Sequence, residues 1–162
     1  MRRVERKGAI MNEGLIFQKM SHEHVDQVYA IEELSFFTPW SKKSIHSEVD
    51  DPIGRYIVLT DKDKVVAYGG FWVVGPEANI NNVAVTPDYR GRGISRLLMG
   101  RLIEMAKDEG AKELYLEVRS GNHVAQNLYR SLGFKMIGLR NGYYIDTQED
   151  AIVMLLDLQV EK

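Results

Sequence analysis

The chain has 162 residues, of which 44% are hydrophobic and 27% are charged, and its formal net charge is −2. This length suits a single hydrophobic core, and the small net charge gives no electrostatic reason to expect a nucleic-acid partner. The sequence contains no cysteine, which excludes disulfides, zinc–thiolate sites and thiol catalysis. No apolar run is long enough to cross a bilayer, and no secretory signal follows the charged start, so we expect a cytoplasmic protein without membrane attachment.

The two ends of the predicted domain are set by composition. Residues 1–13 are polar and basic and include a second methionine, Met11, which predicts a flexible tail or a misassigned start rather than a binding arm. We assign residues 14–160 to one domain. His22 and His24 lie two residues apart, but nothing nearby completes a set of metal ligands. We therefore predict no metal site and expect both histidines to be solvated residues at the start of a helix.

Apolar residues follow strand and helix spacing in turn along the chain. In chain order they predict a strand at 15–20, a helix capped by Ser21, a short helix capped by Ser41, and strands at 56–60, 65–74 and 78–85. A helix from Ile94 to a stop at Gly110, a strand at 114–118, a helix at 122–132 ended by Gly133, and a strand pair at 134–139 and 151–158 follow. We expect the last pair to be joined by a loop that contains Gly-Tyr-Tyr. These elements predict an α/β (α+β) fold with a mixed, largely antiparallel sheet flanked by helices.

A glycine-rich turn follows the strand at 78–85 and leads into the helix that begins at Ile94. Glycines let the backbone approach a ligand closely, and the first amides of a helix have no internal partner. With Arg90, Arg92 and Arg96, these amides can bind an anion, for which phosphate is the natural candidate. The spacing matches neither the P-loop nor the dinucleotide-binding pattern. An ordinary strand-to-helix connection with solvated arginines remains the alternative.

The turn resembles a known motif. The segment Arg90-Gly91-Arg92-Gly93-Ile94-Ser95 is similar to the R/Q-x-x-G-x-G/A coenzyme A motif of the GNAT acetyltransferases, with serine in place of the last glycine or alanine. The resemblance implies a GNAT acyl-CoA N-acyltransferase fold that holds acetyl-CoA, and no metal, where two central strands splay apart. The residues it implies for cofactor binding are Val83, Ala84, Val85, Arg90, Gly91, Arg92, Gly93, Ile94, Ser95, Arg96 and Asn122. An amide of the preceding strand would polarise the thioester carbonyl.

A second segment, residues 114–134, resembles the LxLEVR…N…A…LYxxLGF pattern of the RimI-like branch, the protein N-α-acetyltransferases that include the ribosomal-protein alanine acetyltransferase. By this resemblance Glu117 is the general base and Tyr129 the general acid. A carboxylate can remove a proton from the attacking amine, and a tyrosine with a pKa near 10 can protonate the departing thiolate. Three alternatives stay open: Glu117 is a plain exposed strand residue, Tyr129 only packs against the sheet, and Asn122 only caps its helix.

The segment from Arg140 to Tyr144, followed by Glu-Asp-Ala at 149–151, resembles the N-Y-Y…EDA ending of the same branch, with Gly142 inserted and no proline after the tyrosines. Residues 36–41 are similar to its Pro-Trp-Ser stretch. In the branch these two segments flank the entering peptide. The implied substrate-binding residues are Phe37, Trp40, Tyr143 and Tyr144. Packing alone is the alternative for the two tyrosines.

The amine that is acetylated is predicted from chemistry as well as from resemblance. An N-terminal α-amine has a pKa near 8 and a lysine near 10.4, so a single carboxylate base suits the α-amine better. We expect direct transfer of acetyl from acetyl-CoA to a protein N-terminus, with a ribosomal protein as the leading target. A lysine or small-amine acetyltransferase and a non-catalytic acyl-CoA-binding module are the alternatives. The sequence predicts no oligomeric state.

Overall fold

The computed structural model describes residues 14–159. The predicted tail, residues 1–13, and residue 160, the end of the predicted domain, lie outside this range. In chain order the elements are β1 (Leu15–Lys19), the 3-10 turn η1 (His22–His24), α1 (Val25–Ser35), α2 (Lys42–Asp50), β2 (Gly54–Asp61), β3 (Lys64–Val74), β4 (Glu77–Val85), the 3-10 turn η2 (Pro87–Tyr89), α3 (Ile94–Asp108), β5 (Glu113–Arg119), α4 (His123–Ser131), β6 (Lys135–Tyr144) and β7 (Glu149–Asp157).

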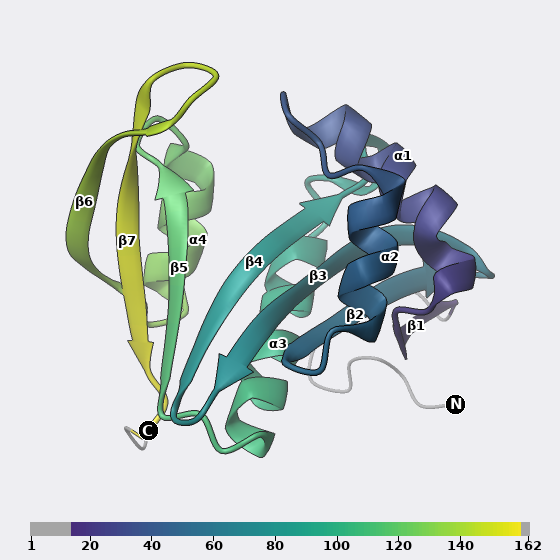
Figure 1. Ribbon diagram of the computed structural model, residues 1–162, viewed down its shortest axis with the longest axis horizontal. Helices are drawn as coiled ribbons and strands as arrows, with labels where there is room; N and C mark the ends of the chain where they lie inside the picture. The colour runs from purple at the N-terminus through teal and green to yellow at the C-terminus, as the bar shows by residue number, and fades with distance from the viewer. Residues whose placement is uncertain (1–13, 160–162) are drawn as a thin grey trace. The chain divides into compact units, whose positions relative to one another are not determined.

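The strands within residues 14–159 follow the sheet order β1-β2-β3-β4-β5-β7-β6 (Figure 1). β1 pairs antiparallel with β2, and β7 pairs antiparallel with both β5 and β6. β4 and β5 are parallel, and their ladder covers Glu77–Asn79 and Glu113–Tyr115. The mixed, largely antiparallel sheet flanked by helices is therefore confirmed. The place of the cofactor between two central strands stays a prediction.

The described residues divide into two units, one formed by residues 14–71 and 81–102 and the other by residues 72–80 and 103–159. In the first unit, α1 and α2 cover one face of β2 and β3 (Figure 1). Serine caps α2 as expected, because the Ser41 hydroxyl oxygen accepts a hydrogen bond from the Ser44 amide at 3.1 Å. The assignment of residues 14–160 to one domain stays a prediction.

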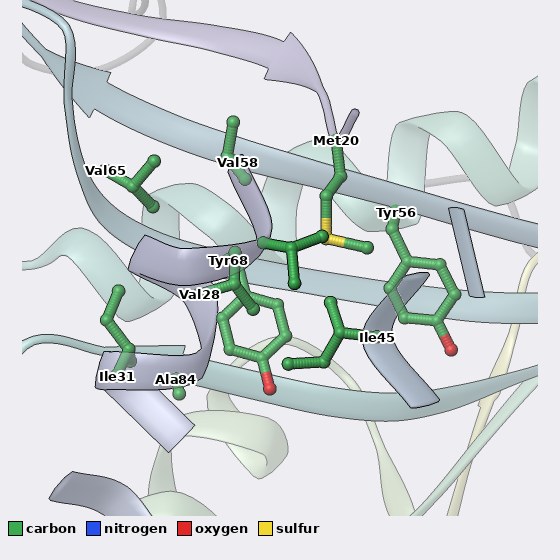
Figure 2. Close-up of a cluster of buried hydrophobic side chains, with 10 residues drawn as sticks. Met20, Val28, Ile31, Ile45, Tyr56, Val58, Val65, Tyr68 and Ala84 are labelled. Atoms are coloured by element: carbon green, nitrogen blue, oxygen red, sulfur yellow. The ribbon is translucent and has the colours of Figure 1, made fainter. Parts of the chain in front are cut away.

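A buried cluster joins the two helices to the strands in this unit. Figure 2 shows Val28 and Ile31 of α1, Ile45 of α2 and the rings of Tyr56 and Tyr68 packed together. Ile45 and Tyr68 are fully buried. These helices are short and contribute little stability alone, so the burial of their apolar faces against the strands is what keeps them folded.

The opposite face of β3 packs against α3. A side-chain carbon at Gly69 would lie 3.2 Å from Leu102 of α3 and 3.1 Å from the Asn82 carbonyl oxygen of β4. Neighbouring residues on a strand point to opposite faces, so Tyr68 faces α1 and α2 while position 69 faces α3. A side-chain carbon at position 69 would be crowded, because both neighbours would have to move by a few tenths of an ångström.

The second unit contains β5, β7 and β6, with α4 lying along β5 (Figure 1). The Gln126 side chain of α4 is buried and donates hydrogen bonds to the carbonyl oxygens of Arg119 and Ser120, both at 3.0 Å. Tyr129 and Phe134 form an edge-on aromatic pair with ring centroids 5.9 Å apart. The predicted stop at Gly133 is confirmed, since its φ of +104° is one that other residues rarely adopt.

Two expectations from the sequence are wrong. The Gly-Tyr-Tyr segment does not form the hairpin loop, because β6 continues to Tyr144 and the turn follows it. The extra Gly142 is accommodated by a register shift between Arg140 and Tyr144. Gly142 itself adopts a φ of +59°, and its amide donates to the Asp150 carboxylate at 2.8 Å. His24 is buried rather than solvated, and its Nδ1 accepts a hydrogen bond from the Ser21 amide at 3.0 Å.

No helix within residues 14–159 is long and apolar enough to cross a membrane.

Packing of α3 on β3 predicts a stability difference between two leucines. Leu102→Ala removes a fully buried side chain and should lower the free energy of unfolding by about 2–5 kcal/mol. Leu34→Ala changes a side chain that is 62% exposed and should cost no more than about 0.5 kcal/mol. Urea denaturation of both variants measures the difference, and equal losses would contradict this packing.

Candidate active site

The glycine-rich turn has the backbone that an anion site requires. Gly91 and Gly93 adopt φ values of +78° and +80°, and nothing lies within 4 Å of the side-chain carbon that either position would carry. Glycine is therefore needed for its conformation and not for space. The Leu97 amide bonds to the Gly93 carbonyl oxygen at 3.1 Å, so the amides of residues 94–96 precede the first intrahelical bond. This geometry fits a phosphate group at the start of α3.

The arginines of the turn differ in what they contact. Arg90 turns back: its Nε donates to the Val85 carbonyl oxygen at 2.8 Å and its Nη2 to the Ser35 hydroxyl at 3.1 Å. Arg92 stacks on the Tyr89 ring at 4.6 Å, and the Tyr89 hydroxyl donates to Asp61 at 2.6 Å. In this conformation Arg90 fixes the turn to β4 and to the end of α1. A direct bond from Arg90 to phosphate stays a prediction.

The strand that precedes the turn is irregular at Asn81. Ala84 belongs to the buried cluster under α1 and α2. Val83 lies on the opposite, α3 face, because its side chain would be 3.3 Å from a side-chain carbon placed at Gly69. Regular alternation would then place Asn81 on the α3 face as well. The side-chain Nδ2 of Asn81 instead donates a hydrogen bond of 2.8 Å to the Tyr56 hydroxyl, which lies on the α1–α2 face. The segment predicted to hold the thioester, Val83–Val85, follows this irregularity directly.

Glu117, the predicted base, lies on β5 with its carboxylate at the surface. Its register partner is Val153 of β7, and Oε2 forms an ion pair with Arg140 Nε of β6 at 3.1 Å. The side chains of Glu117 and Arg140 are 31% and 55% exposed, so solvent screens the pair and its contribution to stability is small. The pair nevertheless keeps the carboxylate beside a cation.

Tyr129, the predicted acid, lies on α4 against Phe134. Burial raises the pKa of its hydroxyl above the usual value, which keeps the phenol protonated at neutral pH. Within residues 14–159 its hydroxyl has no hydrogen-bond partner. Asn122 caps α4, because its Oδ1 accepts from the Ala125 amide at 3.1 Å. This role is compatible with a cofactor contact through the remaining amide protons.

The predicted peptide-binding residues of the first unit lie in the connection between α1 and α2. Phe37 is 78% exposed. Trp40 packs against the buried cluster, with its ring edge-on to Tyr56 at 6.2 Å, and its backbone amide donates to the Glu32 carboxylate at 2.8 Å. One residue of the predicted pair is thus available to a ligand, and the other is partly committed to packing.

In the second unit, Tyr143 and Tyr144 form an edge-on pair at 5.2 Å near the end of β6. The Arg119 guanidinium lies 4.0 Å above the Tyr144 ring. Burial raises the pKa of Tyr144 to about 12, and the charge of Arg119 opposes this effect. The same guanidinium binds both oxygens of Asp146, at 2.8 and 3.0 Å, and lies 3.5 Å from Glu149. Arg119 therefore holds the turn between β6 and β7 against the end of β5.

The contacts of Glu32, Arg119 and Arg140 were not predicted from the sequence. Glu32 gave a detectable signal, because it lies seven residues after Val25 and four after Val28, on the apolar stripe of α1. A carboxylate at such a position must be buried with partners or interrupt the stripe. The two arginines gave no signal of this kind, since strand alternation places them among ordinary surface residues. Within residues 14–159 no group of three or more acidic, histidine or cysteine side chains is arranged to hold a metal ion.

Sheet order, the strand-to-helix turn and its two left-handed glycines define an acyl-CoA N-acyltransferase fold. Residues 25–134 match the acetyltransferase (GNAT) family. A [ribosomal protein bS18]-alanine N-acetyltransferase of Escherichia coli (strain K12) is 39% identical over 136 residues, which cover 82% of this chain and 90% of that protein.

Solved structures agree with this relationship. The ribosomal-protein-S18-alanine N-acetyltransferase from Escherichia coli has a TM-score of 0.84 and 34% identity, covering 91% of this chain and 96% of that one. Arabidopsis thaliana NAA60, solved in complex with acetyl-CoA, has a TM-score of 0.83 at 15% identity, covering 90% and 99%, and supports the fold alone. The chain belongs to the GNAT acetyltransferase family and is an acetyl-CoA-dependent N-acetyltransferase. The predicted resemblance to the RimI-like branch is confirmed.

The contact between Arg119 and Asp146 predicts a pH effect. Hydrogen bonding by Arg119 lowers the pKa of Asp146, so their interaction stabilises the fold above the unfolded-state pKa and is lost as pH falls through the folded-state value. Arg119→Gln should raise the pKa of Asp146 toward its ordinary value, as read from its carboxyl carbon by NMR. The stability difference between the two proteins should shrink below about pH 4.

Arg130→Gln, at an exposed position on α4, is the matched control and should leave the Asp146 titration unchanged. An unaltered titration in Arg119→Gln would show that the arginine does not hold the turn in solution.

Proposed function

We propose that this enzyme acetylates the N-terminal amine of ribosomal protein bS18, at alanine. The observation that carries the proposal is the 39% identity to the Escherichia coli bS18-alanine N-acetyltransferase across 82% of the chain. The chemistry of the candidate residues supports it, since one surface carboxylate and one protonated phenol suit an α-amine with a pKa near 8. A lysine amine, with a pKa near 10.4, would need a stronger means of deprotonation.

In this proposal the turn between β4 and α3 binds acetyl-CoA through its pyrophosphate. Amides at the start of α3 donate to the phosphate oxygens, and Gly91 and Gly93 allow the backbone to approach them. The bound molecule supplies an activated acetyl group on a thioester. Arg92 and Arg96 add positive charge, whereas Arg90 keeps the turn in shape through Val85 and Ser35.

Glu117 is proposed to accept the proton that the amine loses as its nitrogen bonds to the acetyl carbon. The carbon–sulfur bond then breaks, and Tyr129 donates its phenolic proton to the leaving thiolate. The raised pKa of Tyr129 ensures that this proton is present before reaction. Arg140 positions the Glu117 carboxylate through their ion pair. Each proton and electron pair is thereby accounted for without a covalent enzyme intermediate.

Four aromatic residues are proposed to contact the peptide. Phe37 and Trp40 lie between α1 and α2, and Tyr143 and Tyr144 lie at the end of β6. Aromatic rings offer apolar area to a small N-terminal residue, and tyrosine hydroxyls can bond to peptide backbone groups.

The proposed substrate is tested with three peptides and labelled acetyl-CoA. A peptide with the N-terminal sequence of bS18 and a free alanine should be acetylated. The same peptide with a blocked N-terminus should not react, even when it carries a lysine. Mass spectrometry locates the acetyl group. Acetylation of lysine in the blocked peptide, with none at the free N-terminus, would overturn the proposal.

The proposed acid and base are tested by Glu117→Gln and Tyr129→Phe. A general base or acid contributes about 10²–10⁴-fold, so each variant should lose turnover on this scale while calorimetry shows unchanged acetyl-CoA affinity. The Glu117→Gln defect should be largest at low pH, where less of the amine is neutral. Glu113→Gln, four residues earlier on β5, is the matched control and should retain activity. Wild-type turnover in Glu117→Gln would remove this carboxylate from the mechanism.

A further inference from the structure

The first unit contains a buried carboxylate to which the proposed mechanism gives no role. Glu32 of α1 is only 1% exposed and accepts hydrogen bonds from three groups. The Trp40 backbone amide donates at 2.8 Å and Asn82 Nδ2 at 2.7 Å, and the Tyr68 hydroxyl is the third donor. Asn82 Nδ2 also lies 3.1 Å from the Tyr68 hydroxyl, so the four residues form one connected network.

The partners of Glu32 come from segments with different expected roles. Trp40 lies in the connection between α1 and α2, which is expected to contact the peptide. Asn82 directly precedes Val83, the first residue of the segment expected to hold acetyl-CoA. Asn82 is part of a strand, whereas Trp40 lies between two helices, where no sheet bonds fix its backbone. Removal of the carboxylate should therefore release the connection and not the strand.

A second contact runs in parallel with the first. The Trp40 ring lies edge-on to Tyr56, whose hydroxyl accepts from Asn81 Nδ2 at 2.8 Å. The backbone of Trp40 is thus tied to Asn82 through Glu32, and its ring is tied to Asn81 through Tyr56. Two consecutive residues of β4, Asn81 and Asn82, thereby position Trp40 in the connection between α1 and α2.

This carboxylate is poorly explained by stability. Burial raises the pKa of Glu32, and the bonds from Trp40 and Asn82 offset this only in part. A carboxyl group whose pKa is raised on folding stabilises the folded state fully at a pH below its pKa in the unfolded chain. This stabilisation is lost as the pH rises through its pKa in the folded state. At neutral pH an ionised Glu32 therefore costs stability, and an apolar side chain of similar size is often tolerated at such sites.

We propose that Glu32 is a positioning residue that fixes the connection between α1 and α2, through the Trp40 amide, for binding of the peptide substrate. The role of the connection in binding peptide rests on the proposed function. The network holds Trp40 against a rigid strand, so the peptide meets a surface that is ordered before binding.

The test compares Glu32→Met, which removes both carboxylate oxygens at similar volume, with Glu32→Gln, which keeps one oxygen. Glu33→Gln, at the exposed neighbouring position, is the matched control. At saturating acetyl-CoA, Glu32→Met should raise KM for the bS18 peptide roughly tenfold, the factor that corresponds to 1.4 kcal/mol. Glu32→Gln should give a smaller rise, and Glu33→Gln none. The dissociation constant of acetyl-CoA should change by less than about twofold in all three.

A second readout needs no activity. The chain has two tryptophans, so Trp72→Phe leaves Trp40 as the only one. In that background Glu32→Met should make Trp40 fluorescence more sensitive to acrylamide quenching, and Glu33→Gln should not. If Glu32→Met fails to fold, the comparison of Glu32→Gln with Glu33→Gln decides both readouts.

An unchanged KM in Glu32→Met, or a rise matched by an equal loss of acetyl-CoA affinity, would overturn the inference. So would unchanged quenching. Wild-type enzyme that leaves the bS18 peptide unmodified would contradict the proposed function instead, and the quenching comparison would still decide whether Glu32 holds the connection.

Discussion

The left-handed backbone at Gly91 and Gly93 is the constraint on which the proposed chemistry depends. These two conformations turn the chain that follows η2 into α3, so that the first amides of the helix lie together at the turn. Arg90 keeps this geometry by bonding to the Val85 carbonyl oxygen. A residue with a side chain at either glycine would strain the backbone even though space is available, because the obstacle is φ and not packing.

Within each unit a charged side chain holds a segment that carries or adjoins predicted peptide-binding residues. In the first unit the buried Glu32 joins Trp40 to Asn82. In the second, Arg119 bonds to Asp146 and covers the Tyr144 ring. In each case one charged group at the end of a regular element fixes an irregular segment, which has too few backbone bonds of its own to stay in place. The residues predicted to bind the peptide lie in or beside such segments, and function depends on the particular site more than on the shared sheet.

Most of the fold could be predicted because it rests on periodicity and on turn residues. The strand at Leu15, the helix cap at Ser41 and the helix end at Gly133 depend on local propensity, and all three were found where expected. The loop at Gly142 was predicted wrongly because one inserted glycine has two outcomes, a longer turn or a bulge. The choice depends on whether a partner such as Asp150 is available to its amide, which is a property of the neighbouring strand.

The sequence by itself determined the family and which residues are candidates for cofactor, acid and base, since glycine spacing and the segment around Glu117 are local patterns. Tertiary structure alone decided which polar side chains meet. Glu32 and Asn82 are separated by fifty residues, and Arg119 and Asp146 by twenty-seven, yet each pair is in direct contact. Sequence spacing reports periodicity within one element, whereas a hydrogen bond between elements depends on the register and packing of the folded chain.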